Sequence, residues 1–550
     1  MSDQGSHTNT ELKHSPWLVL VVLCLGFFMI LLDTTIVNVA IPAMSDDLNA
    51  SLADVLWILN AYILVYAVLL ITAGRLGDLY GPRRLFIVGL VVFTAASAAC
   101  GFAQNPDQLI AFRVLQGVGG ALLTPQTLTA LTVIFPPDKR GAAFGIWGGV
   151  AGIATLAGPV LGGWLVDDFG WRWIFFVNLP VGILALVGAV IVMPDLKLNR
   201  RHRLDWVGTV LVTTALFLIT FGLIEGQSHD WGEVWGPVTI VEIIVAGVVL
   251  LVVFFLHQWA TRDGEPLVPY QIFRDRNFSV MNYVAAAIAF GMLGLFLPLT
   301  IFLQSVLGLT ALQAGLAFAP MSLISMFIAP FAGRLADRTG GKLILFAGLS
   351  LFSLGMGILI ASSHVDSTRW HLLPGLVVAG VGLGLTFAPL QTVAMRNVEP
   401  RMAGAASGII NTTRQLGGVV GSAAVGALLQ AQLTDKLAAA ARSQTAGLPA
   451  EQRQELLGRF GQSAGDLDIG NSAGGITFPP GTPPQVAELA TRIFHTGFVD
   501  AMRVTLVLPI AVLASGALTV LLVRRRSAGS TPSESFAPEP GGPSVVPGGR

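Results

Sequence analysis

Charged residues are scarce in this 550-residue chain: Asp, Glu, Lys and Arg make up 12% of it, whereas 53% of its residues are hydrophobic. A soluble protein carries roughly a quarter charged residues. The mean hydropathy of +0.71 therefore excludes an ordinary soluble domain and indicates a polytopic membrane protein. The 32 basic residues are balanced by 32 acidic ones, so the chain has no excess of positive charge. We therefore expect no nucleic-acid partner.

Cysteine is also nearly absent. Cys24 and Cys100 both lie in apolar runs, so we expect no disulfide framework and no cysteine-based metal site. The eight histidines lack metal-ligand spacing, and neither a P-loop nor a nucleophile elbow occurs. We therefore predict that the chain is not an enzyme, that it has no catalytic residue, metal or cofactor, and that ATP does not drive it directly.

Long apolar runs are abundant instead. A helix that spans a bilayer needs roughly 20 mostly apolar residues. Fourteen runs approach or exceed this length, at residues 17–41, 55–73, 85–103, 108–134, 142–166, 173–193, 205–224, 237–257, 278–304, 313–332, 343–361, 371–395, 403–430 and 498–523. An even number places both termini on one side, and the Lys and Arg residues of alternate loops place that side in the cytoplasm. The sequence predicts an all-α, multi-pass protein of the cytoplasmic membrane, and no cleavable signal peptide is evident.

Three segments of the first half recur in the same order in the second half. The pairs are GRLGDLYGPRRL (74–85) with GRLADRTGGKLI (333–344), TPQTLTAL (124–131) with APLQTVAM (388–395), and KRGAAFG (139–145) with RMAGAASG (401–408). Parallel repeats of this kind are typical of transporters that rock two bundles around a central site.

The repeats divide the chain into five parts. These are a cytoplasmic N-terminus (1–16), a six-helix bundle (17–193), a linker with two inserted spans (194–277), a second six-helix bundle with a long outside loop at 431–497 (278–523), and a disordered cytoplasmic tail (524–550).

Five motifs carry a resemblance to a known family. They are LDTTIVNVAIP (32–42), GRLGDLYGPRR (74–84), RVLQGVGGA (113–121), GIATLAGPVLGG (152–163) and WRWIFFVNLP (171–180). With them the sequence resembles the major facilitator superfamily, in particular its fourteen-helix drug:proton antiporter branch, the multidrug and quaternary-ammonium efflux type. The resemblance implies the major facilitator fold, with two six-helix bundles plus two inserted helices, and export rather than uptake.

Asp33 is the one ionisable side chain of the first apolar run. A carboxylate deep in a span costs about 2.5–3.5 kcal/mol on insertion scales, and is tolerated where it faces a bundle interior or a watery cavity. Its neighbours Thr34, Thr35 and Asn38 favour a cavity wall, and contact with water at the outer end of the helix is the alternative. In the resembled fold the helix of Arg113 is adjacent, so this pair is expected to couple transport to protons. A permanently ionised pair that only fastens two helices is the alternative.

The first repeat is expected to act as a conformational latch. Asp78 ends a helix at the membrane surface, where a carboxylate interacts favourably with the N-terminus of another helix, and glycines permit a tight turn and close backbone approach. The predicted latch residues are Gly74, Asp78, Gly81, Arg83, Arg84 and, in the repeat, Asp337. A plain topology signal explains the two arginines equally well.

Further polar and small residues lie inside the spans. Gly158, Pro159, Gly162 and Gly163 match the glycine–proline motif that the resembled family associates with antiport, and they fit either a gating hinge or tight packing. Seven side chains are candidates for lining a cavity: Asn38, Gln116, Gln126, Gln391, Asn411, Arg414 and Gln415. Glu242, one and a half turns into an inserted span, is expected to serve packing or the outer interface, and Glu225 to be solvated.

Together these features predict a proton-coupled exporter of bulky hydrophobic drugs or antibiotics that works as a monomer in contact with membrane lipid. Because few intramembrane carboxylates accompany Asp33, we expect neutral or weakly basic substrates. The alternative is a dedicated exporter of one endogenous metabolite or lipid. A receptor or scaffold that had lost transport would be expected to lack Asp33 or Arg113, and both are present.

Overall fold

The computed structural model describes residues 15–50, 52–136, 138–195, 205–226, 229, 231–261, 266–399, 402–445 and 484–524. The tail that we expect to be disordered therefore lies outside the described residues, apart from Arg524.

The first half consists of seven helical segments. They are α1 (Pro16–Leu48), α2 (Leu52–Tyr80), α3 (Pro82–Gly101), α4 (Pro106–Ile134), α5 (Arg140–Phe169), α6 (Trp173–Phe176) and α7 (Asn178–Val192). Pro16, Pro82 and Pro106 open their helices, where the missing proline N–H would have no partner in any case. Between α2 and α3 the chain turns at Gly81, whose φ of 91° suits glycine.

The second half follows a pair of inserted helices, α8 (Trp206–Glu225) and α9 (Ile240–Ala260). Its segments are α10 (Tyr270–Arg274), α11 (Arg276–Ile301), the π-helix η1 (Phe302–Val306), α12 (Ala311–Ala317), α13 (Ala319–Thr339), α14 (Lys342–Ser362), α15 (Leu373–Gly384), α16 (Phe387–Ala394), α17 (Ala403–Gln444), α19 (Pro484–Thr505) and α20 (Val507–Val520).

The predicted spans are present as helices. Among the described residues, thirteen helical stretches are long and apolar enough to cross a membrane. Together with α5, a continuous helix of 30 residues, they correspond one to one to the fourteen predicted spans. Several spans consist of two segments, such as α6 with α7 and α12 with α13, because the helix is interrupted at Val177 and at Phe318.

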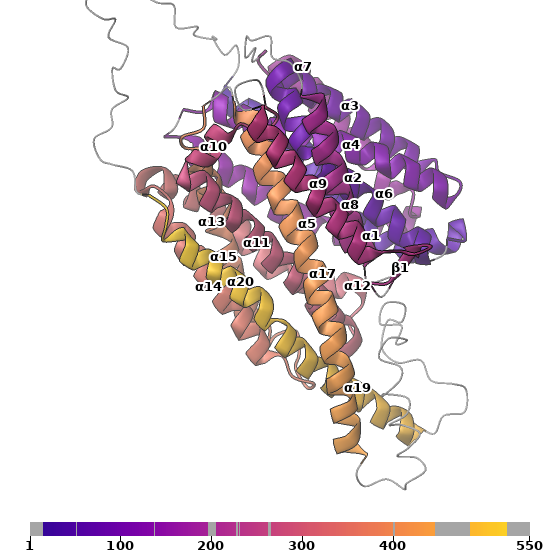
Figure 1. Cartoon of the computed structure of the whole chain (residues 1–550). Coiled ribbons are helices and arrows are strands. Elements are labelled where there is room, and N and C mark those ends of the chain that lie inside the picture. The colour runs from indigo at the N-terminus through magenta and orange to yellow at the C-terminus, as the bar shows by residue number, and fades with distance from the viewer. Residues whose placement is uncertain are drawn as a thin grey trace, which may run out of the picture.

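The two halves lie side by side and meet along two seams (Figure 1). At one seam α2 packs against α17, and at the other α5 packs against α13. The inserted pair is attached to the first of these seams, because α8 packs on both α2 and α17. The rings of Trp57 and Phe221 lie 5.9 Å apart at this junction. The inserted helices thus cover a boundary between the halves, which the sequence did not predict.

A short β-hairpin precedes α9 and was not predicted. It pairs β1 (Glu233–Trp235) with β2 (Val238–Thr239) in antiparallel register. Thr239 then caps α9, and the Glu242 carboxylate accepts from the backbone N–H of Thr239, which completes a capping box. Glu242 is therefore exposed in the first turn of its helix, and its predicted position deeper in the span is wrong.

Glu225, at the end of α8, was expected to be solvated. Its side chain is instead buried and lies 3.5 Å from Nδ1 of His229. This expectation is wrong because the hairpin that follows α8 folds back over the end of the helix: Gly226 accepts a backbone hydrogen bond from Trp231.

The predicted outside loop at 431–497 is wrong at both ends. Helix α17 continues to Gln444 and α19 begins at Pro484, so the two pack together as a helical hairpin beyond the bundle (Figure 1). Leu437 is fully buried and lies against Gly497, where an added Cβ would be 3.0 Å from the Leu437 Cα. The charged residues of this extension lower its hydropathy, although one face remains apolar and buried. The central part of the loop lies outside the described residues.

Candidate functional site

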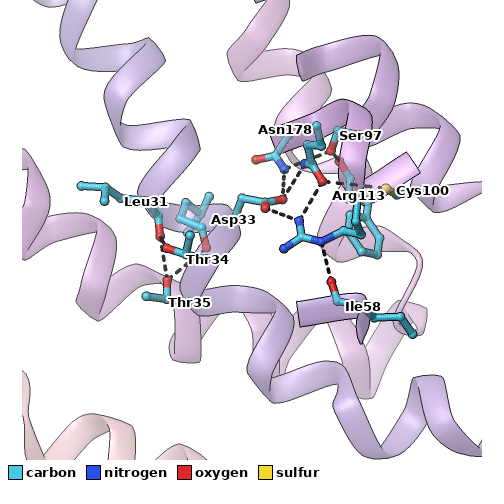
Figure 2. Close-up of polar contacts among 12 residues, drawn as sticks. Leu31, Asp33, Thr34, Thr35, Ile58, Ser97, Cys100, Arg113 and Asn178 are labelled. Carbon is cyan, nitrogen blue, oxygen red and sulfur yellow. Dashed lines mark hydrogen bonds and ion pairs between the residues drawn. The ribbon is translucent and has the colours of Figure 1, made fainter. Parts of the chain in front are cut away.

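A fully buried ion pair joins α1 to α4 inside the first half. Asp33 Oδ2 accepts a hydrogen bond from Arg113 Nη1, and the two side chains are 0% and 1% exposed (Figure 2). These two residues are predicted partners from the sequence, and the structure brings them together. Burying both charges is tolerated only when further hydrogen bonds satisfy them, so the surrounding residues are part of the site.

Polar neighbours complete this pair. Gln116 Nε2 donates to Asp33 Oδ1 at 2.7 Å and Asn178 Nδ2 donates to the same oxygen at 3.2 Å. Arg113 Nε donates to the Ile58 carbonyl at 3.0 Å, and its guanidinium lies 4.4 Å from the ring centroid of Tyr62. The carboxylate therefore accepts from three side chains contributed by two helices, α4 and α7.

Asp33 is fully buried and does not lie on the wall of the central cavity, so its predicted position at a cavity wall is wrong. Thr34 and Thr35 bond back to the Leu31 carbonyl of their own helix, and Asn38 donates to the Thr34 carbonyl at 2.8 Å. Leu31 lines the central cavity. Two residues advance an α-helix by about 200°, so Asp33 points to the opposite side of α1, into the first half.

The latch motif joins the two halves. Both oxygens of Asp78, at the end of α2, accept hydrogen bonds from the first turn of α17: from Gly404 N and from Ala405 N, each at 2.9 Å. The two helices touch through their backbones here, since an added Cβ at Gly74 would overlap with the Gly404 carbonyl oxygen. A carboxylate at these free N–H groups also interacts favourably with the helix dipole.

The repeat forms the equivalent contact at the other seam. Asp337, near the end of α13, accepts from Gly141 N at 2.8 Å and from Ala142 N at 3.2 Å, in the first turn of α5. An added Cβ at Gly333 would overlap with the Gly141 carbonyl oxygen. The third repeat pair therefore supplies the helix N-termini that the first pair caps, and the halves close on each other at this end of the bundle.

Not every predicted latch residue bridges the halves. Gly81 supplies the turn between α2 and α3. Arg83 donates to the Val190 carbonyl at 2.6 Å, so it caps the end of α7 within the first half. Arg84 is exposed. The inclusion of the two arginines in the contact between halves is wrong, and they fit the topology signal instead.

The glycine motif of α5 lies against α1. An added Cβ at Gly158 would overlap with the hydroxyl oxygen of Thr35, and one at Gly162 would be 2.9 Å from Ile36. Gly163 has more room, with Leu312 at 3.7 Å. Position 159, the proline of the motif, lies within the continuous helix α5. Gly158 and Gly162 therefore allow α5 to pack closely against α1 at Thr35 and Ile36.

An apolar cavity of about 170 Å³ lies between the halves. Its walls come from α1, α5, α11, α13, α15, α16 and α17, and include Phe296, Met321 and Phe387. Of the seven predicted lining residues, the structure places two, Arg414 and Gln415, on its wall.

The other five predicted lining residues have different positions. Asn38 is exposed and Gln116 belongs to the ion-pair network. Gln126 donates to the Ala73 carbonyl at 2.8 Å, and Asn411 donates to the Ser407 carbonyl at 2.9 Å. Gln391 is buried in α16, away from this cavity wall. Gln116 and Gln126 thus bond to neighbouring helices, and Asn411 bonds within its own helix, instead of lining the cavity.

Comparison with known proteins agrees with this architecture. The model of the major facilitator superfamily matches residues 23–422. The chain belongs to the major facilitator superfamily. Its resemblance to the drug-exporting members is confirmed by its relatives. It is 35% identical over 539 residues to the tetracenomycin C resistance and export protein of Streptomyces glaucescens, covering 96% of each chain. It is 36% identical over 524 residues to the probable actinorhodin transporter of Streptomyces coelicolor, covering 90% of each.

A solved major facilitator structure supports the fold. The human organic anion transporter MFSD10 aligns with a TM-score of 0.56 at 13% identity, over 91% of this chain and 100% of that chain. At this identity the likeness concerns the fold alone. The chain is accordingly a multi-pass membrane transporter of small molecules with the major facilitator fold.

Sequence reasoning missed parts of the site of this superfamily member. Asn178 lies within the quoted motif WRWIFFVNLP, and a single amide in an apolar run is a signal that could have identified it. Outside the spans, Arg172 and Trp171 donate hydrogen bonds to Asp47 at 2.6 and 3.0 Å. The first of these bonds, and then the second, lowers the pKa of Asp47 below its usual value. This cluster fastens the loop before α6 to the end of α1.

Proposed function

We propose that this chain is a proton-coupled exporter of bulky hydrophobic drugs or antibiotics in the cytoplasmic membrane. The observation that carries the proposal is the buried Asp33–Arg113 pair, placed inside one half and apart from an apolar central cavity. A buried ionisable group in a span is a functional-site hypothesis by default. The names of the two Streptomyces relatives, which describe resistance, export and transport, support this proposal.

The coupling follows from contacts between helices. A proton on Asp33 removes the charge that Arg113 faces, and so weakens the attachment of α1 to α4. Helix α1 packs on α5 through Thr35 and Gly158. The N-terminus of α5 is in turn held by Asp337 of the other half. Protonation of Asp33 in the first half therefore acts through α1 and α5 on the Asp337 contact, which holds the two halves together. The proton gradient drives this change, and no cofactor takes part.

The orientation rests on charge. Basic residues such as Arg84, Lys139 and Lys342 gather at the end of the bundle where the latch contacts lie, and this excess marks the cytoplasmic side. At the same end Arg524 N donates to Asn277 Oδ1 at 2.9 Å, and the ring of Trp17 lies 5.1 Å from that of Phe135. Both ends of the described chain are thus cytoplasmic, and the latch closes the cavity on that side.

The test is a resistance and efflux panel in a pump-deficient bacterial host. The wild-type chain should raise resistance to several hydrophobic compounds and drive their efflux under a proton gradient, whereas Asp33→Asn should abolish both at equal membrane abundance. Undiminished efflux by Asp33→Asn would remove this carboxylate from the mechanism. Activity confined to one endogenous compound would favour the dedicated exporter.

A further inference from the structure

The central cavity contains one charged side chain, Arg414. Among the residues that line it, Arg414 is the only ionisable one, and the remainder are apolar, small or uncharged polar side chains. Arg414 follows Gly404 of the latch by ten residues along α17, a rise of about 15 Å. This is half of a hydrocarbon core of about 30 Å. The positive charge therefore lies near the middle of the membrane, where the two halves face each other.

This guanidinium is poorly satisfied. Its Nη2 donates to Asn411 Oδ1 at 3.1 Å, while its Nε is buried without a hydrogen-bond partner. No Asp or Glu among the described residues forms an ion pair with it. Arg113 provides the contrast within the same chain, since it meets a carboxylate, an amide, a carbonyl and an aromatic ring.

Arg414 is partly exposed at the apolar wall of the cavity, and an anion that enters the cavity would supply the charged partner that its guanidinium lacks. Arginine presents several donors in a planar fork that suits carboxylates and other delocalised oxyanions. Ser322 and Ser325 line the same cavity from α13, and their hydroxyl groups are further donors to such oxygens. Phe296 and Phe387 supply aromatic surface for the apolar remainder of a ligand.

We propose that Arg414 recognises the acidic group of an otherwise hydrophobic, aromatic substrate, so that the chain exports lipophilic organic acids in preference to their neutral analogues and to cations. This inference rests on the proposed export function and specifies its substrate class. It replaces the expectation of neutral or weakly basic substrates. That expectation rested on the small number of carboxylates in the spans, and it did not consider that Arg414 would be the one charged residue on the cavity wall.

Binding to the purified full-length protein tests this assignment with a matched pair of ligands. Anthraquinone-2-carboxylic acid and its methyl ester share the same aromatic body and differ in one negative charge. At pH 7 the wild-type protein should bind the acid at least about 10-fold more tightly than the ester, as expected when one charge-assisted hydrogen bond is gained. Arg414→Gln should bring this ratio close to one while ester binding changes less than about twofold.

Two control variants separate charge from shape. Arg414→Lys keeps the positive charge and should keep most of the preference for the acid, although it loses the fork geometry. Arg492→Gln makes the same change at an exposed arginine of α19 outside the cavity and should leave the preference intact. Equal binding of acid and ester by the wild type, no binding of either, or a parallel loss of both in Arg414→Gln would overturn the assignment.

The proposed export function is judged separately, by efflux in cells. If the preference for the acid is absent while Asp33-dependent efflux of other compounds is intact, only the role of Arg414 is overturned. Preferential acid binding without any proton-driven efflux would overturn the exporter and leave the binding site.

Discussion

Asp33 is held more tightly than a proton-binding group at the edge of a cavity would be. Its two oxygens accept from Arg113, Gln116 and Asn178, and its side chain is wholly inaccessible in this conformation (Figure 2). A proton reaches such a group only when the helices around it move. In the proposed mechanism, binding of the proton therefore requires movement of these helices, and the central cavity lies on the other face of α1.

The buried pair predicts strong coupling between two substitutions. Asp33→Asn strands the Arg113 cation and Arg113→Gln strands the carboxylate, and loss of one partner of a buried pair costs about 3–5 kcal/mol. The double variant Asp33→Asn/Arg113→Gln should be more thermally stable in detergent than the less stable single variant, and still inactive in efflux. A double-mutant cycle on unfolding measures this coupling. Strictly additive losses of stability would show that the two side chains do not support each other.

The pairing of Asp33 with Arg113 could be predicted from the sequence, because two charges in apolar runs need partners and the fold that the sequence resembles implies that their helices are neighbours. Tyr62 could not be predicted, since an aromatic residue in a span is usually ordinary packing; here its ring lies under the guanidinium. The cavity lining was predicted poorly for a related reason. Gln126 and Asn411 bond to backbone carbonyls, and polarity alone does not indicate which side of a helix a residue faces.

At the scale of helices, each half caps a helix of the other. Asp78 of α2 holds the N-terminus of α17, and Asp337 of α13 holds that of α5. Each carboxylate satisfies two backbone N–H groups that a helix leaves unpaired at its start. Because both contacts lie at the same end of the bundle, both must break before the cavity opens at that end.

The latch predicts similar effects of two distant substitutions. Asp78→Asn and Asp337→Asn each replace a charged acceptor of two N–H groups by an amide with one acceptor oxygen, and should shift the protein toward the inward-open state. Each should slow turnover several-fold while binding of a hydrophobic ligand changes little, and the double variant should be slower than either. Efflux rates and equilibrium binding on the same preparations measure both quantities. Equal losses of binding and turnover would indicate misfolding instead of a shifted equilibrium.

The α17–α19 hairpin predicts a separate effect on stability. Gly497→Leu places a side chain against the backbone of Leu437, and overpacking of this kind costs about 1–3 kcal/mol. We expect a lower melting temperature in detergent with efflux largely retained, because the hairpin projects beyond the bundle. Gly357→Leu in α14 is the matched control, since an added Cβ there meets no atom within 4 Å. An unchanged melting temperature for Gly497→Leu would contradict the packing.

The number of spans could be predicted from apolar runs because a helix that crosses the hydrocarbon core must be mostly apolar over its whole length. The ends of α17 and α19 could not, since outside the hydrocarbon core a helix needs only one apolar face, as at Leu437. The capping box at Glu242 and the hairpin before it were missed for the same reason. Short polar elements depend on local hydrogen bonds, which hydropathy does not register.

At the scale of the whole molecule, the structure represents a conformation closed at the end of the bundle where the two aspartate contacts lie. The backbone carbonyl of Gly141 occupies the place of any side chain at position 333. Closure thus depends on glycine at this seam, and a larger residue here acts on the equilibrium between the two global states without touching the ion pair or the cavity.

Gly333→Leu should therefore hold the cytoplasmic side open. With the buried Cys24 and Cys100 replaced by Ala, a reporter cysteine at position 415 should react several-fold faster with a membrane-impermeant maleimide in inverted vesicles when Gly333→Leu is present. Gly357→Leu again serves as the control and should leave the rate unchanged. Unchanged labelling in Gly333→Leu would mean that the halves part without breaking this contact.

The reciprocal latch has a consequence for the origin of the chain. The contact of Asp78 with the start of α17 and the contact of Asp337 with the start of α5 have the same form. In the first the second half donates the hydrogen bonds, and in the second the first half does. Such an exchange is the mark of an isologous interface between two identical subunits. A half-length ancestor that carried both the aspartate and the glycine-rich helix start would have dimerised through the same contact about a two-fold axis. Helices α8 and α9 take no part in this reciprocal contact, and they pack at the junction between the halves through α2 and α17.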